Sequence, residues 1–488
     1  MGLSTALRNL AERLAAPAAG RPRVLLVTCP GATAVRLAAE AAVAGLGGKP
    51  ADSPAQADVL LVAGEPGREL SDAADVLWGQ MPGPRARGEA RRPQDADAVL
   101  RGLLPALAGP GQETEAARRD DEWGRDGGGS GGAGEDGHGE YGGRGHDGHQ
   151  GHGGDHGGGH GDHGGHGGMR MPGGLTAAER AEDRDGLRLD VLRVPLGPVL
   201  PGWPAGLVID TVLQGDVVQR AEGRVLPSAG PCPPPFWRAD GDHHAAPGPR
   251  TAACHLDSLG RLLTVAGWEA AAAGARRLRD RLLAGEPADA VHADFGTWRR
   301  RVERSRTLRW ATDGVGVLTP ADAVRLGVSG PAVRARPPHD ATARWLRWLT
   351  EAEEALAGQE VPEGGPRGGR APDGSPPSRG LLDAAVELAP GLELSSARLL
   401  VASLDPDPDE LAAGPEPDGA REEGAGEEPH QGRHGHGGHE GHQGHQGNRD
   451  RGEPPDHGQR RGRGEGGEGH GHGDGHGEGG HGGGGGGR

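Results

Sequence analysis

Cysteine, lysine and aromatic residues are scarce in this chain. Three of its 488 residues are cysteine, and phenylalanine, tyrosine and tryptophan together make up 2 %. The cysteines Cys29, Cys232 and Cys254 are too few, and odd in number, for a disulfide framework. Lys49 is the only lysine, and the chain is rich in alanine, glycine and proline. This composition is typical of a GC-rich coding sequence, so the many arginines are weak support for nucleic-acid binding.

Long apolar runs are also missing. No stretch approaches the ~20 apolar residues that cross a bilayer, and residues 1–20 lack the apolar centre of a signal peptide. No GxxxxGK[ST] phosphate loop occurs, and no GxGxxG lies between an expected strand and helix. We therefore expect a cytoplasmic protein, peripheral at the inner face of the cell membrane and in contact with that membrane only through a partner.

Glycine and proline are present in great excess. The chain has 96 glycines and 41 prolines, more than a quarter of its length, while apolar residues make up only 33 %. Such a composition without a collagen repeat predicts extensive disorder. The net charge of −17 comes largely from acidic linkers and tail, so it mainly favours solubility. About half of the chain is expected to fold, around residues 20–108 and 186–350.

The first folded part is a small α/β module at residues 1–108. Residues 23–28 and 57–63 are short apolar runs typical of buried parallel strands. Helices are expected at 32–46, 70–81 and 96–108, between and after these strands. Strands that alternate with helices predict a parallel sheet. Residues 109–185 follow as a disordered linker rich in histidine and glycine, because they lack the apolar side chains that would offset the entropy of ordering.

The second folded part spans residues 186–357 and mixes strands with helices. Strands are expected at 189–194 and 206–218, with a hairpin turn at Gln214-Gly215-Asp216. Helices are expected at 251–273, 275–283, 292–312 and 339–356, with a break at Gly274 and a short helix starting at Thr319-Pro320. A linker at 358–380, a short structured segment at 381–404 and a disordered tail at 405–488 complete the predicted order.

Histidine tracts in the linker and tail are the clearest chemical feature. From His146 to His166 the spacing is three or four residues throughout, so neighbouring imidazoles of a flexible chain can converge on one Ni²⁺, Zn²⁺ or Cu²⁺ ion. The alternative is a low-complexity expansion without a role. The candidate metal ligands are His138, His146, His149, His152, His156, His160, His163, His166, His434, His436, His439, His442, His445, His470, His472 and His476.

Two further clusters have weaker chemical signals. Cys232, His243, His244 and Cys254, with Asp240 and Asp242 between them, form a candidate minor metal site, and the alternative is a solvated loop.

The arginine-rich segment 299–309 could meet acidic lipid, nucleic acid or an acidic partner, but a solvated face with ion pairs is the default expectation. No aromatic residues interleave with these arginines in the way single-strand binding needs, so we expect no nucleic-acid partner. The tryptophans, Trp310 included, are expected to pack in the core or at an interface.

The sequence resembles respiratory complex I and the related membrane-bound NiFe-hydrogenases in two places. Within residues 189–344, Gly197-Pro198-Val-Leu-Pro201 is similar to the GPQHP turn of the large, quinone-site subunit, and Gly314–Arg334 is similar in order and spacing to a later segment. Residues 57–64 (ADVLLVAG) and 80–85 (QMPGPR) resemble the ADVLIVAG and QMPEPR signatures of the small iron–sulfur subunit. The resemblance implies an α+β fold, in which a small parallel α/β module precedes a hydrogenase-large-subunit-like module of N-terminal β-strands plus a helical bundle.

The resemblance also implies NADH–quinone oxidoreductase chemistry, with quinone and NAD binding and other complex I-like or hydrogenase-like subunits as partners. The residues depart from that pattern. Leu200 and Pro204 stand where the quinone turn has histidines. Cys29 stands at the first cluster loop without the further cysteines that a [4Fe–4S] cluster needs, and no CxxC pair exists for nickel and iron. An iron–sulfur cluster is therefore not expected, which favours an accessory, non-catalytic member; the alternative is a protein that stores or delivers divalent metal.

Overall fold

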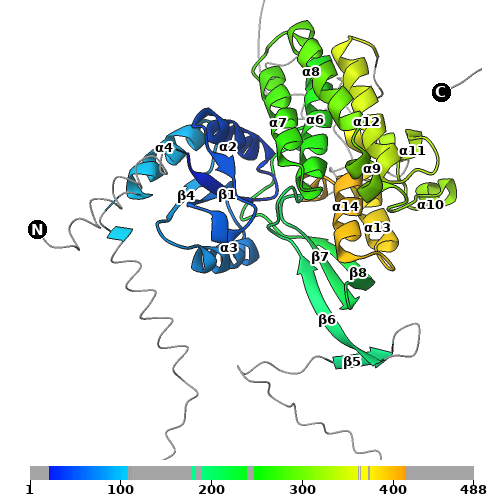
Figure 1. Ribbon diagram of the computed structural model, residues 1–488, viewed down its shortest axis with the longest axis horizontal. Helices are drawn as coiled ribbons and strands as arrows, with labels where there is room; N and C mark the ends of the chain where they lie inside the picture. The colour runs from blue at the N-terminus through cyan, green and yellow to red at the C-terminus, as the bar shows by residue number, and fades with distance from the viewer. Residues whose placement is uncertain are drawn as a thin grey trace, which may run out of the picture. The chain divides into compact units, whose positions relative to one another are not determined.

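The computed structural model describes residues 21–107, 109, 111–112, 179–182, 188–238, 247–360, 362, 364–371 and 374–412, with only the backbone for 179–182. The chain divides into two units at Asp418–Gly419, and all of the described residues lie in the first. The candidate histidines of the linker and tail, together with His243 and His244, lie outside the described residues. The predicted α+β class is confirmed by one parallel and one antiparallel sheet accompanied by helices (Figure 1).

A four-stranded parallel sheet of order β2-β1-β3-β4 forms the first module. Its strands are β1 (Arg23–Thr28), β2 (Lys49–Pro50), β3 (Val59–Ala63) and β4 (Ala86–Ala90). Its helices are α2 (Thr33–Gly45), α3 (Arg68–Gln80) and α4 (Ala96–Leu107), with 3₁₀ turns η1 (Pro54–Gln56) and η2 (Pro93–Asp95). Every side chain of β3 is buried, as its unbroken apolar sequence predicts. Strand β4 was not predicted, because ARGEA is polar; Gly88 in its middle lets Val99 and Leu103 approach closely.

An antiparallel sheet of order β5-β6-β7-β8 opens the second module. Its strands are β5 (Glu179–Glu182), β6 (Arg188–Leu196), β7 (Leu207–Gln214) and β8 (Val217–Val225). The predicted hairpin turn is confirmed between β7 and β8, where Gly215 adopts φ of +62°. One face of the sheet packs against α13 (Pro377–Leu388) and α14 (Leu394–Leu404) through Leu382, Leu400 and their neighbours. Residues 381–404 are therefore a central part of this core.

The helices of the second module, besides α13 and α14, are α6 (Pro247–Val265), α7 (Glu269–Leu283), α8 (Ala288–Glu303), α9 (Arg306–Thr312), α10 (Pro320–Arg325), α11 (Pro331–Arg334), α12 (Ala341–Leu356) and α15 (Pro408–Ala412), with a 3₁₀ turn η3 (Gly365–Arg367). Two buried tryptophans of this module, Trp345 and Trp348, pack among residues of α6, α7, α9 and α14. No helix among the described residues is long and apolar enough to cross a bilayer.

Two helix boundaries and one expected linker differ from prediction. The break between α6 and α7 falls at Ala266–Trp268. Gly274 stays helical, and its lack of a side chain leaves room for the indole of Trp298. The single helix expected at 292–312 is two, since Ser305 caps α9 by accepting from the Leu308 N–H at 3.2 Å. Residues 358–380 were expected to be a linker, yet η3 within them is buried.

The expected start of the disordered tail at residue 405 is wrong for residues 405–412. Asp405, Asp407, Asp409 and Glu410 are each at most 5 % exposed, and α15 forms over the end of this segment. Four acidic residues in eight predict a solvated segment from composition alone. Partners distant in the sequence decide the outcome, and these partners define the site described next.

Candidate functional site

Asp257 lies at the centre of a buried cluster of charges. It projects from α6, is 1 % exposed, and accepts two hydrogen bonds from Arg36 of α2, at 3.1 Å to Oδ1 and 2.7 Å to Oδ2. Arg279 of α7 donates a third bond to Oδ1 at 2.7 Å. Burial raises the pKa of the Asp257 carboxyl, but the guanidiniums of Arg36, Arg261 and Arg279 outweigh burial, and the pKa lies well below its usual range. Asp257 is therefore a permanent anion.

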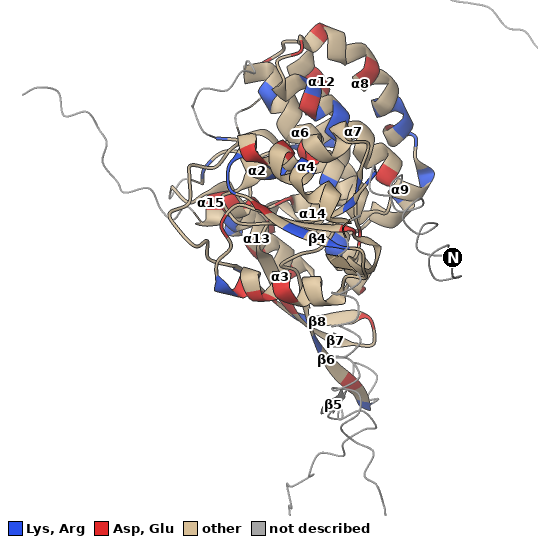
Figure 2. Cartoon of the chain, turned by 90° about the vertical axis from the view of Figure 1, so that its left-hand side faces the viewer, with Lys and Arg blue, Asp and Glu red and all other residues tan. Residues whose placement is uncertain are grey.

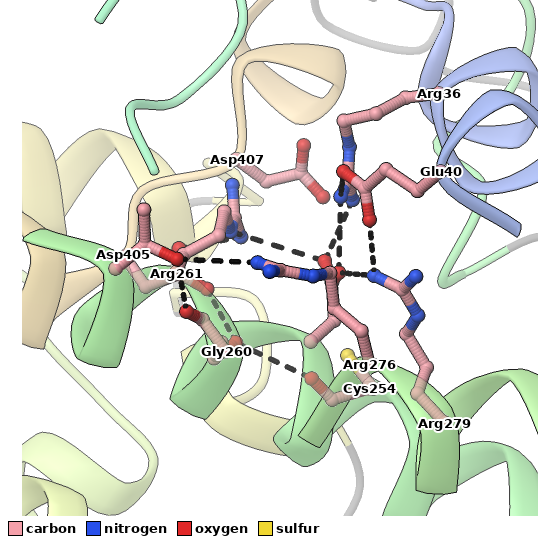
Figure 3. Close-up of polar contacts among 12 residues, drawn as sticks. Arg36, Glu40, Cys254, Gly260, Arg261, Arg276, Arg279, Asp405 and Asp407 are labelled. Carbon is pink, nitrogen blue, oxygen red and sulfur yellow. Dashed lines mark hydrogen bonds and ion pairs between the residues drawn. The ribbon is translucent and has the colours of Figure 1, made fainter. Parts of the chain in front are cut away.

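Glu40 extends the charge cluster along α2. Its carboxylate is 2.9 Å from the Nη1 atom of Arg36, one helical turn earlier, and 2.8 Å from Nη1 of Arg279 across the junction (Figure 3). Burial raises the pKa of Glu40, while the charges of Arg36 and Arg279 lower it, and the net pKa is below the ordinary value. Carboxylates and guanidiniums thus alternate across the contact between α2 and the helices α6 and α7. A buried charge is stable only when it is paired in this way.

The carboxylate of Asp405 brings the C-terminal segment into the same cluster. Arg367 of η3 contacts Asp405 twice, through Nη2 to Oδ2 at 2.7 Å and through Nε to the backbone oxygen at 2.9 Å. Arg261 of α6 also pairs with Asp405, and is 3.8 Å from Asp257 (Figure 3). Ser258, one turn of α6 from Cys254, donates to Asp405 as well. Arg261 therefore links the centre of the cluster to the segment 405–412.

Asp409 holds the loop that follows β1. Its Oδ1 atom accepts a hydrogen bond of 2.7 Å from the N–H of Gly31, and its carboxylate also bonds the Thr33 side chain at the start of α2. Burial, together with the nearby charge of Asp407, raises the pKa of Asp409 to about 6. Helix α2 has no side-chain cap of its own, so a carboxylate from far along the chain serves its first turn.

The residues around Cys29 do not match the ligand set of an iron–sulfur cluster. Cys29 lies on this same loop, is 1 % exposed, and has its pKa raised to about 12 by burial and by the charges of Glu89 and Glu65. A cluster ligand is a thiolate, so a cluster at Cys29 would have to displace a firmly held proton. The chain has three cysteines in all, one fewer than the four thiolates that such a cluster takes.

The other two cysteines have different neighbours. Cys254 on α6 is buried against Gly365, 3.6 Å from Nη1 of Arg367, and burial raises its pKa to about 12. Cys232 lies 3.1 Å from the Ser228 hydroxyl and against Gly31. Within the described part of the chain, no three His, Cys, Asp or Glu side chains are arranged to hold a metal ion. The minor site that includes His243 and His244 stays a prediction.

In the turn between β6 and β7, apolar residues occupy the two positions where the resembling family has histidines. Leu200 packs half-buried against the core under the antiparallel sheet, and Pro204 is buried. Trp203 between them donates its indole N–H to the Leu207 carbonyl at 2.8 Å. Neither Leu200 nor Pro204 offers a side-chain donor for a quinone oxygen.

His255 and Glu351 lie next to each other in the core, without a hydrogen bond between them. Both residues are 0 % exposed, with 3.4 Å between Nε2 and Oε2, and Oε1 of Glu351 already accepts from Arg334 and Arg347. Burial lowers the pKa of His255 to about 3, and the charges of Arg334, Arg367 and Arg347 act in the same direction. His255 is thus a neutral imidazole inside the protein.

The sequence contains one signal for the charge cluster that the prediction overlooked. Arg36 and Glu40 are the only charged residues of α2, and they are four residues apart in a helix otherwise made of Ala, Val, Leu, Thr and Gly. An isolated charged pair in an apolar helix indicates partners elsewhere in the fold. The identity of those partners, hundreds of residues away, could not be read from spacing.

Comparisons with known proteins return structural likeness but no match in sequence. No known family matches the sequence, and no curated protein matches it. Among solved structures, a chain of the membrane-bound sulfane sulfur reductase, an archaeal respiratory membrane complex, is 15 % identical with a TM-score of 0.32. The match covers 46 % of this chain and 98 % of that one. A likeness of this extent does not assign the protein to a family.

Proposed function

We propose that this protein is a non-redox accessory subunit of a complex I-like or hydrogenase-like respiratory assembly. Its sequence joins modules that resemble the small and large subunits of such an assembly. The observation that carries the proposal is the bidentate pair of Arg36 and Asp257, which joins the two modules through a buried charge cluster. The loop that would hold a cluster in the family contains instead a protonated, buried Cys29 and the carboxylate of Asp409.

The side chains at this junction include no group that can carry electrons. Arginine, aspartate and glutamate neither accept nor pass electrons at physiological potentials, and the three cysteines cannot complete a cluster. The resemblance implies quinone and NAD binding, yet a quinone at the β6–β7 turn would need hydrogen-bond donors other than Leu200 and Pro204. A binding role, in which the fused modules hold partner subunits at the cytoplasmic face of the membrane, uses the residues that are present.

The test is the composition of the complex in its native host. The protein is purified without metal-affinity resin, and its partners, iron, acid-labile sulfide and visible absorption are measured. We expect subunits of a respiratory complex to co-purify in fixed ratio, and NADH–quinone reductase activity to be absent from the isolated chain. Stoichiometric iron and sulfide in the isolated chain, or the absence of respiratory subunits, would overturn the proposal.

Metal storage or delivery is a second candidate function, based on the histidine tracts. Their spacing of three or four residues, with aspartate and glutamate interleaved, suits divalent nickel, zinc or copper. In this case the folded modules serve as a docking scaffold. The two functions separate when the tracts are deleted, because partner binding depends on the folded modules and metal binding on the histidines.

A further inference from the structure

The junction between helices α8 and α9 presents an exposed tryptophan beside several arginines. Trp310 is 83 % exposed, so of the two expected places for the tryptophans, the core and an interface, it does not lie in the core. Arg300, Arg301, Arg304 and Arg306 are exposed next to it in sequence. We call these five residues the α8–α9 corner. Figure 2 shows blue segments following one another from α8 to α9.

Helix α9 is held rigidly, so the exposure of Trp310 is built into the fold. Leu308 and Thr312 of α9 are buried, and Thr312 bonds both Thr342 and the indole N–H of Trp345. Arg306 and Trp310 are four residues apart in this helix and share its outer face. Arg300 and Arg304 have the same spacing at the end of α8. The corner thus presents a fixed apolar ring flanked by cations.

The arginines of the corner have no carboxylate partners among the described residues. Arg300 contacts only the Thr297 hydroxyl at 3.2 Å, and Arg301 lies over the Trp268 ring at 5.5 Å. Their neighbour Arg299 is different, because it pairs with Glu303 and Glu353. Arginines elsewhere commonly find carboxylates, as in the pairs of Arg281 with Glu286 and Asp294. Unpaired cations on a chain of net charge −17 form a local site for anions.

We propose that the α8–α9 corner docks the protein directly onto an anionic lipid bilayer, with the guanidiniums on lipid phosphates and Trp310 in the interfacial layer. Guanidiniums bind phosphate oxygens in a bidentate manner, and tryptophan is enriched at the membrane–water interface. A bilayer offers phosphates at any spacing, which suits four cations without a fixed geometry. Single-stranded nucleic acid is less suited, because it needs several stacking rings and this corner has one. The contact is direct, whereas the sequence alone predicts a membrane contact only through a partner.

The proposal is tested by co-sedimentation of the full-length protein with vesicles. One set contains phosphatidylcholine alone and the other phosphatidylcholine with phosphatidylglycerol, both with a chelator so that the histidine tracts carry no metal. The test variant is Arg300→Gln/Arg301→Gln/Arg304→Gln/Arg306→Gln. The matched control carries the same loss of charge at exposed positions elsewhere, Arg68→Gln/Arg188→Gln/Arg277→Gln/Arg336→Gln. A further variant, Trp310→Ser, removes the apolar anchor while every charge stays.

We expect the wild type and the matched control to bind anionic vesicles and not neutral ones. Each arginine contributes about fivefold near an anionic surface, so the test variant should lose more than a hundredfold in partition coefficient. Trp310→Ser should weaken binding to anionic vesicles several-fold, and added salt should weaken the wild type. Equal binding of the test variant and the control, equal binding to both vesicle types, or binding to a single-stranded oligonucleotide in place of vesicles would each overturn the proposal. Failure here leaves the proposed accessory function standing, because that function is tested by its subunit partners.

Discussion

The guanidinium of Arg36 and the carboxylate of Asp257, 221 residues apart in the chain, form a bidentate pair with 1 % of the Asp257 side chain exposed. Both residues have a second partner, Glu40 for Arg36 and Arg279 for Asp257, so the pair is part of a cluster with alternating charges. Such a cluster is costly to bury and costly to break. We therefore expect the stability of each module to depend on the other.

Arg36→Met should therefore destabilise the protein strongly. The change leaves Asp257 with fewer cations in a buried site, and removal of one partner from a buried pair typically costs 3–5 kcal/mol. The measurement is the free energy of unfolding in denaturant. The control is Arg101→Met, which breaks the exposed pair with Asp97 and should leave the free energy of unfolding almost unchanged. Similar losses in the two variants would show that the junction is not held by the charge pair.

Asp409→Asn should remove a pH dependence from folding. The pKa of Asp409 is about 6 in the folded protein and 3.8 ordinarily, so the folded state holds a proton that the unfolded state has lost between these values. Stability from this group is full below pH ~4 and is lost as pH rises to ~6, at up to about 1.4 kcal/mol per pH unit. Asparagine keeps an oxygen for the Gly31 N–H but cannot ionise. Unfolding free energies of the two proteins, measured across this range, should diverge; parallel curves would contradict the buried, protonated carboxyl.

His255→Gln should act at acidic pH with the opposite sign. The pKa of His255 is about 3 in the fold and 6.5 ordinarily, so the unfolded state binds the extra proton between these values. Stability from the neutral imidazole is present above pH ~6.5. It is lost as the pH decreases below that value, by up to about 1.4 kcal/mol per pH unit. Glutamine near Glu351 has no such titration, so acid unfolding of the variant should show a smaller pH slope. A folded-state imidazole that titrates near neutral pH, followed by NMR, would contradict this.

The structure shows what the sequence could and could not predict. Strand β3 and the β7–β8 hairpin could be predicted from the local sequence, because an apolar run favours a buried strand and a Gly-Asp pair favours a tight turn. Strand β4 and α15 have polar sequences, and only partners far along the chain make them fold inward. The candidate site is of this second kind. Arg36 and Glu40 are visible as charges in an apolar helix, whereas Asp257, Asp405 and Asp409 become a site only when the chain is folded.

The three thiols should differ sharply in reactivity. Burial raises the pKa of both Cys29 and Cys254 to about 12, so neither is a thiolate at neutral pH, and both are shielded from solvent. Cys232 is only partly buried. Titration of the native protein with a thiol reagent should therefore modify Cys232 first, and Cys29 and Cys254 only after denaturation. The native Cys232→Ser variant should not react with the reagent over the same period. Rapid modification of Cys29 would contradict the closed loop after β1.

Divalent metal binding should depend on the histidine tracts and not on the folded modules. With an ordinary pKa near 6.5, most imidazoles in these tracts are neutral at pH 7 and free to coordinate. Calorimetric titration of the full chain with Ni²⁺ should show several weak sites, and deletion of residues 127–168 and 430–481 should abolish them. Because protonated imidazole cannot coordinate, binding by the full chain should also fall steeply below pH ~6.

The control replaces the histidines of both tracts with glutamine at unchanged length, and should match the deletion. Persistence of tight binding in either variant would place the metal at the folded modules, with Cys232, His243, His244 and Cys254 as the first residues to substitute.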